Sequence, residues 1–349
     1  MTAAAGVELP DFVARPPWWG GDLQTLRSHL LGRTPPRLPG APAERLLLPM
    51  DDGSGDRLAA ALNRPEEDRG RPTVLLRHGV TGCEDGAYMV HAAEHFLALG
   101  HPVVRLNFRG AGPSRATCRL HHHSGRTGDL DAAIRGLGPA LTARGLLAVG
   151  FSLGGNTLLK YLGERGDAAA PILAAASVSA PIDLIASARC LLRRRNALYQ
   201  RTILAGLKRG TLAPPAELTD AERAAVLDAR TVVEFDDRFT APRHGFAGAE
   251  DYYTTCAAAR FLPGIRTPTL LVHARDDPFV PAAAYLALDW RRLPHLTPLL
   301  PKGGGHLGFH DRAGSWHLRR IAAFFAAGRG AAAADRRTEP GRATAALEA

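Results

Sequence analysis

One serine stands in a sequence pattern that can make its hydroxyl a nucleophile. Residues 150–154 read GFSLG, a G-x-S-x-G pattern that follows an apolar, strand-like segment and precedes a helix-like one. The glycines allow a sharp turn between the two, so the hydroxyl of Ser152 projects from the edge of a sheet. The start of the helix supplies a partial positive charge and backbone N–H groups for a developing oxyanion. The pattern predicts a nucleophile at Ser152 and an oxyanion donor in the N–H of Leu153.

A serine hydroxyl needs a base to take its proton, and 14 histidines compete for that role. His306 lies in a glycine-rich loop, KGGGHLGF, which follows the last expected strand and can reach across the sheet edge. His273 falls within an expected strand, which favours a place in the core. The HHH run at residues 121–123 has no second cluster of ligands, and consecutive side chains cannot all face one ion. We therefore expect His306 to be the base, and we expect no metal site.

The base needs an acid that orients it, which should follow a strand and lie between the serine and the histidine. Asp276 and Asp277 directly follow the apolar segment TLLVHAR and are the best candidates. Asp183 and Asp251 belong to a helical stretch that interrupts the strand pattern, and they are weaker candidates. The residues alone leave both Asp276 and Asp277 open.

A second oxyanion donor is expected in the segment HGVTG, residues 78–82, which forms a tight turn after the first strongly apolar strand. The backbone N–H of Val80 is the best candidate, with His78 and Gly79 shaping the loop. The alternative interpretation is an ordinary turn at the end of a strand.

Apolar strand-like segments alternate with helix-like segments around these residues. Strands are expected at residues 73–76, 101–107, 146–150, 172–179, 269–273 and 297–300, with a hairpin over 44–63 and helices at 87–98, 128–137, 155–163, 282–290 and 316–327. This alternation predicts an α/β fold with a mostly parallel sheet covered by helices on both faces. The alternation stops over residues 182–262, which are mostly helical in pattern.

Ordered motifs along most of the chain resemble the α/β-hydrolase superfamily, and more closely its YheT-like branch of serine hydrolases. They extend from about residue 17 to 325 and comprise WW and LQT (18–25), RHGVTG (77–82) with Tyr88, LNFRG (106–110), HSG (123–125) with DL (129–130), GFSLGGN and KYLG (150–163), SAP (179–181), FDDRFTAPRHGF and DYY (235–253), DDPFVP (276–281) and GGHLGF (304–309).

The resemblance implies a charge-relay system made of the serine, the acid of the DDP motif and the last histidine, here Ser152, Asp277 and His306. The acid of this superfamily usually stands four residues before a proline, and Pro281 therefore favours Asp277. Two segments depart from the family pattern and bear on the details of the substrate pocket. Asp22 replaces a usual histidine, and GAY (86–88) lacks the usual Ser-Pro before its tyrosine.

The chain is expected to divide into five parts. These are an N-terminal arm (1–43), a first part of the α/β-hydrolase core (44–181), a helical cap insertion (182–262), a second part of the core (263–327) and a disordered tail (328–349).

The composition excludes general disorder and a disulfide-stapled miniprotein, because 46% of the 349 residues are hydrophobic and the four cysteines form no CxxC pair. No apolar run of 18 residues or signal-peptide pattern is present, so we expect a soluble protein, by default cytoplasmic. The net charge is +9, and residues 184–216 contain seven basic residues and no acidic one. This stretch lies in the expected cap and is interpreted as an arginine-coated helix or as a surface for anionic lipid.

The predicted function is hydrolysis of a carboxylic acyl ester, from a small molecule or a lipid, through an acyl-enzyme intermediate and without a cofactor. Acyl transfer and lipase- or phospholipase-type activity are the alternatives. Peptide cleavage is less favoured, as is a non-catalytic binding protein on a hydrolase fold. No specific nucleic-acid partner is expected, because the chain has no zinc-ligand spacing or RNP-like aromatic motif. The sequence indicates neither the acyl chain length nor the oligomeric state.

Overall fold

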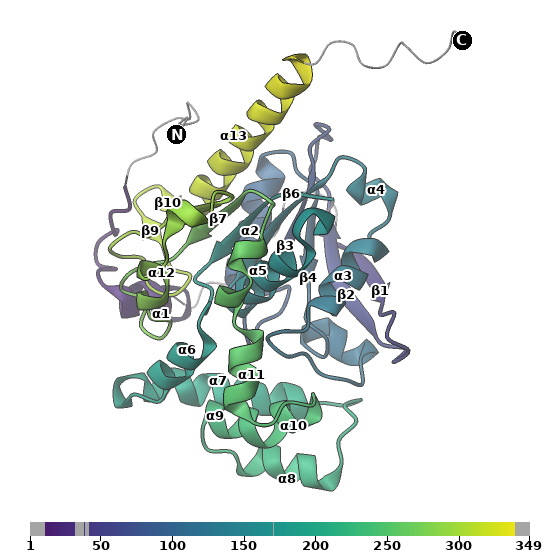
Figure 1. Cartoon of the computed structure of the whole chain (residues 1–349), viewed down its shortest axis with the longest axis vertical. Helices are drawn as coiled ribbons and strands as arrows, with labels where there is room; N and C mark the ends of the chain where they lie inside the picture. Colours follow the sequence, from purple (N-terminus) through teal and green to yellow (C-terminus); the bar gives the residue numbers. More distant parts are fainter. Residues whose placement is uncertain (1–10, 32–37, 39–41, 170, 339–349) are drawn as a thin grey trace.

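The computed structural model describes residues 11–31, 38, 42–169 and 171–338. An eight-stranded sheet runs through its centre in the order β1-β2-β4-β3-β5-β6-β7-β8 (Figure 1). Strands β3 to β8 are parallel, whereas β2 is antiparallel to both β1 and β4. The strands are β1 (Glu44–Pro49), β2 (Arg57–Asn63), β3 (Thr73–Arg77), β4 (Val103–Leu106), β5 (Leu146–Phe151), β6 (Ile172–Val178), β7 (Thr269–Val272) and β8 (Leu296–Leu299). The predicted hairpin and the mostly parallel sheet are confirmed.

Helices cover both faces of this sheet. Helices α3 (Thr127–Gly136) and α5 (Leu153–Arg165) pack on one face, and α2 (Ala87–Ala98) and α13 (Trp316–Thr338) pack on the other. In β5, Leu146 and Ala148 belong to the hydrophobic cluster on the face of α3 and α5, whereas Leu147, Val149 and Phe151 belong to the cluster on the face of α2 and α13. Successive side chains of a strand point to opposite faces, so a strand buried on both faces is apolar throughout.

The alternation of strands and helices is interrupted between β6 and β7. This segment contains helices and connecting loops but no strand, and all of its residues are described. Figure 1 places it at one end of the sheet, opposite the end of α13. We call residues 182–262 the helical insertion, whose α-helices are α6 (Leu184–Leu191), α7 (Ala197–Leu212), α8 (Asp220–Asp228), α9 (Val232–Phe235), α10 (Ala241–Arg243) and α11 (Ala249–Cys256).

Two helices differ in length from the sequence expectation. Helix α13 continues past Ala327 to Thr338, through an alanine-rich stretch with high helix propensity. The rest of the expected tail, 339–349, lies outside the described residues. Helix α12 (Ala283–Leu286) is shorter than expected, because Asp289 caps a separate short 3₁₀ turn. Two further short helices are α1 (Gly21–Leu30) and α4 (Pro139–Thr142). Within the described ranges, no helix combines the length and apolar character needed to cross a membrane.

Candidate active site

Ser152 occupies a strained turn between β5 and α5. Its φ of 50° lies in the left-handed region that residues other than glycine rarely adopt. Two neighbouring glycines make the turn possible. A Cβ on Gly154 would lie 2.4 Å from the carbonyl oxygen of His78, and one on Gly150 would lie 2.5 Å from the carbonyl oxygen of Gly154. The strand–turn–helix arrangement around Ser152 is thus present, and Ser152 lines a cavity.

The loop after β8 brings His306 to Ser152. The Nε2 atom of His306 lies 3.0 Å from Oγ of Ser152, and its Nδ1 atom lies 2.8 Å from Oδ2 of Asp277. An ionised carboxylate can only accept a hydrogen bond, so Nδ1 carries the proton and Nε2 presents its lone pair to the hydroxyl. Three side chains from distant parts of the chain form one hydrogen-bonded series.

The carboxylate of Asp277 is buried and accepts hydrogen bonds on both oxygens. Oδ1 accepts the backbone N–H groups of Phe279 and Val280 at 3.1 and 2.9 Å, and Oδ2 faces His306. Burial raises the pKa of this carboxyl, but the His306 ring and the backbone donor outweigh burial, so its pKa lies below the usual range. Asp277 is therefore ionised at neutral pH.

The neighbouring carboxylate of Asp276 has a different partner. Its Oδ1 accepts the backbone N–H of Gly305 at 2.9 Å. Burial raises the pKa of Asp276 above its ordinary value. Of the two acids that the residues left open, Asp277 contacts the ring of His306 and Asp276 contacts the backbone beside it.

The remaining acid and base candidates are engaged elsewhere. His273 follows β7 and stacks on Tyr285, with ring centroids 4.3 Å apart. Asp183 caps α6 by accepting the N–H of Ala186 at 2.9 Å. Asp251 accepts a backbone N–H just before α11. These three side chains therefore have structural contacts of their own.

The histidine run at residues 121–123 lines the cavity, but its members have separate partners. His121 Nε2 donates to the carbonyl of Thr211 at 3.1 Å, and His122 Nδ1 donates to the carbonyl of Arg109 at 3.0 Å. Burial lowers the pKa of His121 to about 3 and that of His122 to about 4, so both are neutral at pH 7. Among the described residues, no three or more His, Cys, Asp or Glu side chains are grouped to hold a metal ion.

The HGVTG turn lies directly against Ser152. A Cβ on Gly79 would be 2.9 Å from Cβ of Ser152. Burial lowers the pKa of His78 to about 3, and the neutral ring donates from Nδ1 to the Gly79 carbonyl at 2.7 Å and accepts the Phe108 N–H at Nε2. The hydroxyl of Tyr88 accepts the N–H of Gly79 at 2.8 Å. These bonds hold the turn rigidly beside the serine.

Two backbone N–H groups beside Ser152 have no protein acceptor. In the part of the chain that the structure describes, neither the N–H of Val80 nor that of Leu153 makes a hydrogen bond. Leu153 is the first residue of α5, where N–H groups lack an intrahelical acceptor, and Val80 follows the fixed Gly79. Both residues line the same cavity as Ser152.

This cavity of about 460 Å³ lies between the loops at the sheet edge and the helical insertion. Its charged lining comes from Arg115, Arg209 and Asp236, and most of the rest of the lining is apolar. Apolar side chains from α6, α7, the π-helical turn Asp236–Thr240 and the loop after β7 include Leu184, Leu191, Ile203, Leu207, Phe239 and Phe279. Such a wall suits an apolar part of a ligand.

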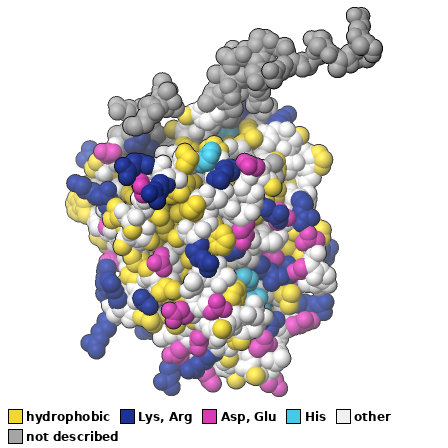
Figure 2. All heavy atoms as spheres, in the orientation of Figure 1, with side chains coloured by type: hydrophobic (Ala, Val, Ile, Leu, Met, Phe, Trp, Pro, Cys, Tyr) yellow, Lys and Arg dark blue, Asp and Glu magenta, His cyan; other side chains and the backbone are white. Residues whose placement is uncertain are grey.

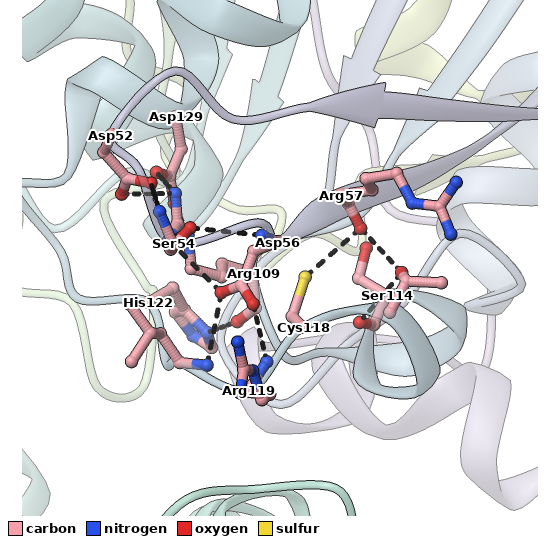
Figure 3. A network of polar contacts seen from close by, with 12 residues as sticks. Asp52, Ser54, Asp56, Arg57, Arg109, Ser114, Cys118, Arg119, His122 and Asp129 are labelled. Atoms are coloured by element: carbon pink, nitrogen blue, oxygen red, sulfur yellow. Dashed lines mark hydrogen bonds and ion pairs between the residues drawn. The ribbon is translucent and has the colours of Figure 1, made fainter.

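Arg109 lies at the centre of a network of polar contacts (Figure 3), to which the sequence analysis assigned no role. Arg109 is 1% exposed, and its guanidinium lies 2.9, 3.2 and 2.8 Å from carboxylate oxygens of Asp52, Asp56 and Asp129. The network joins the β1–β2 turn, α3 and the loop that carries His122. Arg109 belongs to the LNFRG motif, but its partners lie on three other segments, so local spacing cannot reveal them.

Comparison with known proteins places this chain in a family. Residues 72–313 match the family described as the alpha/beta hydrolase fold. The chain is 35% identical to YheT of Escherichia coli over 280 residues, which cover 76% of this chain and 78% of YheT. The chain belongs to the α/β-hydrolase fold family, in its YheT-like branch.

Two further comparisons extend this family placement. The chain is 34% identical to phospholipase ABHD3 of Mus musculus over 70% of its own length but only 60% of ABHD3. Among solved structures, the Pyrococcus furiosus esterase Pf2001 has a TM-score of 0.57 and 16% identity, covering 84% of this chain and 97% of that one. At this identity, the likeness to Pf2001 concerns the fold alone.

Proposed function

We propose that this α/β-hydrolase cleaves carboxylic acyl esters, with Ser152 as the nucleophile, His306 as the base and Asp277 as the acid that orients it. The observation that carries the proposal is the hydrogen-bonded series Ser152–His306–Asp277, at distances of 3.0 and 2.8 Å, on the wall of an apolar cavity. Family membership and the phospholipase name of the ABHD3 relative agree with it.

The reaction proceeds in two halves. Nε2 of His306 takes the hydroxyl proton while Oγ of Ser152 attacks the ester carbonyl carbon, and the carbonyl electron pair moves to oxygen. The tetrahedral intermediate that results then collapses and breaks the C–O bond to the alcohol, which leaves with the proton from His306. A water deprotonated by His306 then attacks the acyl-enzyme, which releases the acid and regenerates Ser152. Asp277 keeps Nδ1 protonated and stabilises the ring when it is charged.

The backbone N–H groups of Val80 and Leu153 are the proposed oxyanion donors. Neither group has an acceptor among the described residues, and both lie beside Ser152, so they can donate hydrogen bonds to the negative charge that develops on the carbonyl oxygen. Neither requires a side chain, and their positions depend instead on the turn at Gly79 and on the start of α5.

The proposed substrate is an ester with an apolar acyl chain, and the helical insertion serves as the cap over it. The cavity between cap and sheet has an apolar wall, which would contact the chain. Lipid esters are therefore included among the candidates, alongside simpler small-molecule esters. Acyl transfer to an alcohol other than water would use the same residues.

The direct test compares wild-type protein with Ser152→Ala. We expect wild type to hydrolyse p-nitrophenyl esters and to react with a fluorophosphonate probe at Ser152, and the variant to do neither. Esters of graded chain length, monoacylglycerols and phospholipids then define the substrate, and added acceptor alcohols separate transfer from hydrolysis. Full activity of Ser152→Ala, or a wild type that neither hydrolyses esters nor reacts with the probe, would overturn the proposal.

We also propose that α7 and the residues before it contact anionic lipid. Leu192 and Leu198 are 46% and 64% exposed within the stretch that has seven basic and no acidic residues. Trp19 of the arm is 61% exposed, and Asp22 in the first turn of α1 binds Arg195 at 2.7 Å. Figure 2 shows hydrophobic side chains beside basic ones on this face. Exposed Trp and Leu among arginines are typical of surfaces that bind membranes.

Vesicle binding tests this contact. We expect stronger sedimentation with vesicles that contain anionic lipid than with neutral ones, and a loss of that difference in Arg194→Glu/Arg201→Glu. Arg260→Glu/Arg266→Glu replaces two exposed arginines outside the stretch and serves as the charge-matched control. Equal binding of the wild-type protein to both vesicle types would contradict the proposed contact.

A further inference from the structure

The loop that carries His306 adopts a backbone that cannot be stable on its own. Leu307 and Phe309 have φ angles of 61° and 49°, in the left-handed region that is unfavourable for non-glycine residues. Gly304 and Gly305 beside them also have positive φ. Strained conformations persist only where surrounding contacts determine them. The contacts that hold this loop therefore also determine where the imidazole of His306 lies.

Several of these contacts come from the N-terminal arm. The backbone N–H of His306 donates to Oγ1 of Thr25 at 2.8 Å, and the hydroxyl of Thr25 donates to the carbonyl of Gly21 at 2.7 Å. The second bond directs the hydroxyl proton away from His306 and leaves a lone pair for the His306 N–H. Thr25 thus connects α1 to the backbone of the proposed base.

Gln24 forms hydrogen bonds to the other end of the same loop. It is 1% exposed, and its Oε1 accepts the N–H of His310 at 2.8 Å. Its Nε2 donates to the carbonyls of Trp18 at 2.7 Å and His310 at 3.2 Å. The side-chain amide therefore binds both backbone groups of His310, which fixes the end of the loop four residues after His306.

Helix α1 and the loop are packed too closely for side chains between them. A Cβ on Gly305 would lie 2.3 Å from the carbonyl oxygen of Gly21, and one on Gly308 would lie 2.6 Å from that of Gln24. A Cβ on Gly21 would lie 1.9 Å from the carbonyl oxygen of Asp276. The arm, the loop and the turn before Asp277 form one contiguous packed unit.

We propose that Gln24 and Thr25 are positioning residues that hold the His306 loop at the distance from Ser152 that proton transfer requires. This inference rests on the proposed function. Neither side chain contacts Ser152, Asp277 or the imidazole ring, so both act through the loop backbone. Their removal should lower kcat while leaving KM nearly unchanged, because the cavity that binds the ester is formed by other residues.

Thr25→Val tests the proposal, because it keeps the shape of the side chain and removes the hydroxyl. We expect kcat and the rate of fluorophosphonate labelling at Ser152 to fall roughly ten- to hundredfold, with KM within about twofold. Thr25→Ser restores the hydroxyl and should recover most of the activity. Thr142→Val is the matched control, since the hydroxyl of Thr142 also donates to a carbonyl one helical turn back, that of Gly138 at 2.9 Å. Thr142 lies in α4 and is not among the residues that line the cavity.

A second variant tests the same positioning role independently, in case Thr25→Val impairs folding. Gln24→Met removes the bonds to His310 and should also lower kcat, and circular dichroism and thermal unfolding establish that each variant is folded. If wild type is active and folded Thr25→Val and Gln24→Met match it, the positioning role is wrong and the proposed function stands. If wild type neither hydrolyses esters nor labels at Ser152, the proposed function itself fails.

Discussion

Asp276 and Asp277 are neighbours in the chain, and they bind neighbouring residues of one loop in different ways. Asp277 contacts Nδ1 of His306 at 2.8 Å, whereas Asp276 accepts the backbone N–H of Gly305 at 2.9 Å. One carboxylate thus faces the ring that would become charged during catalysis, and the other fixes the chain that carries it. The two acids should respond very differently to the same substitution.

Asp277→Asn should lower kcat by a factor on the order of 10³ to 10⁴, because an amide favours the wrong tautomer of His306 and cannot stabilise its charged form. Asp276→Asn retains an oxygen that can accept the N–H of Gly305, so we expect only a small change. Steady-state kinetics on one ester compares the two variants. Similar losses in both, or a larger loss in Asp276→Asn, would reverse the assignment.

Gly79→Ala should reduce kcat/KM by roughly 10²- to 10³-fold. The added methyl would lie 2.9 Å from Cβ of Ser152 and displace the neighbouring Val80 N–H. Gly128→Ala is the matched control, because nothing lies within 4 Å of the added Cβ. Kinetics with a circular dichroism check compares them. An active Gly79→Ala would show that this turn does not supply the oxyanion donor.

Asp236→Asn should make stability less dependent on pH. Burial raises the pKa of Asp236 from 3.8 to about 6. A raised folded-state pKa means that its stabilising contribution is full below pH 3.8 and is lost as the pH rises through about 6. Because the residue is partly exposed, we expect the variant to gain about 1 to 2 kcal/mol relative to wild type between pH 4 and pH 8.

Urea unfolding of both proteins at the two pH values measures this gain. The Asp236 carboxylate accepts a hydrogen bond from the Tyr253 hydroxyl at 2.6 Å, which the Asn oxygen can also accept. The difference between wild type and Asp236→Asn therefore reports the effect of the negative charge on the Asp236 carboxylate. Stability curves that stay parallel from pH 4 to pH 8 would contradict the prediction.

Arg109→Met should destabilise the fold by about 3 to 5 kcal/mol, because the buried carboxylates of Asp56 and Asp129 lose their shared cation. Arg144→Met breaks an exposed pair with Asp68 and should leave the unfolding midpoint nearly unchanged. Denaturant unfolding measures both. A midpoint for Arg109→Met equal to that of wild type would mean that the network adds nothing to stability.

The sequence predicted the features that depend on short stretches. The G-x-S-x-G turn at Ser152, the alternation of strands and helices and the interruption after β6 are local patterns, and the structure contains all of them. The residues alone could not distinguish Asp277 from the adjacent Asp276, so the prediction of Asp277 depended on the spacing to Pro281 that is usual in the superfamily. The bonds of Thr25 to His306 and of Arg109 to Asp56 join distant segments through side-chain packing, which periodicity and spacing do not encode.

The bond between Thr25 and His306 spans 281 residues of the chain. At 5 to 20 residues per second, the ribosome needs roughly 15 to 55 s to add the second partner after the first. During the last 154 residues of that interval, the nascent chain holds Ser152 without the histidine proposed to activate it. In a nascent chain, the proposed nucleophile therefore stays without its proposed base until the loop that carries His306 has been synthesised and has packed against α1.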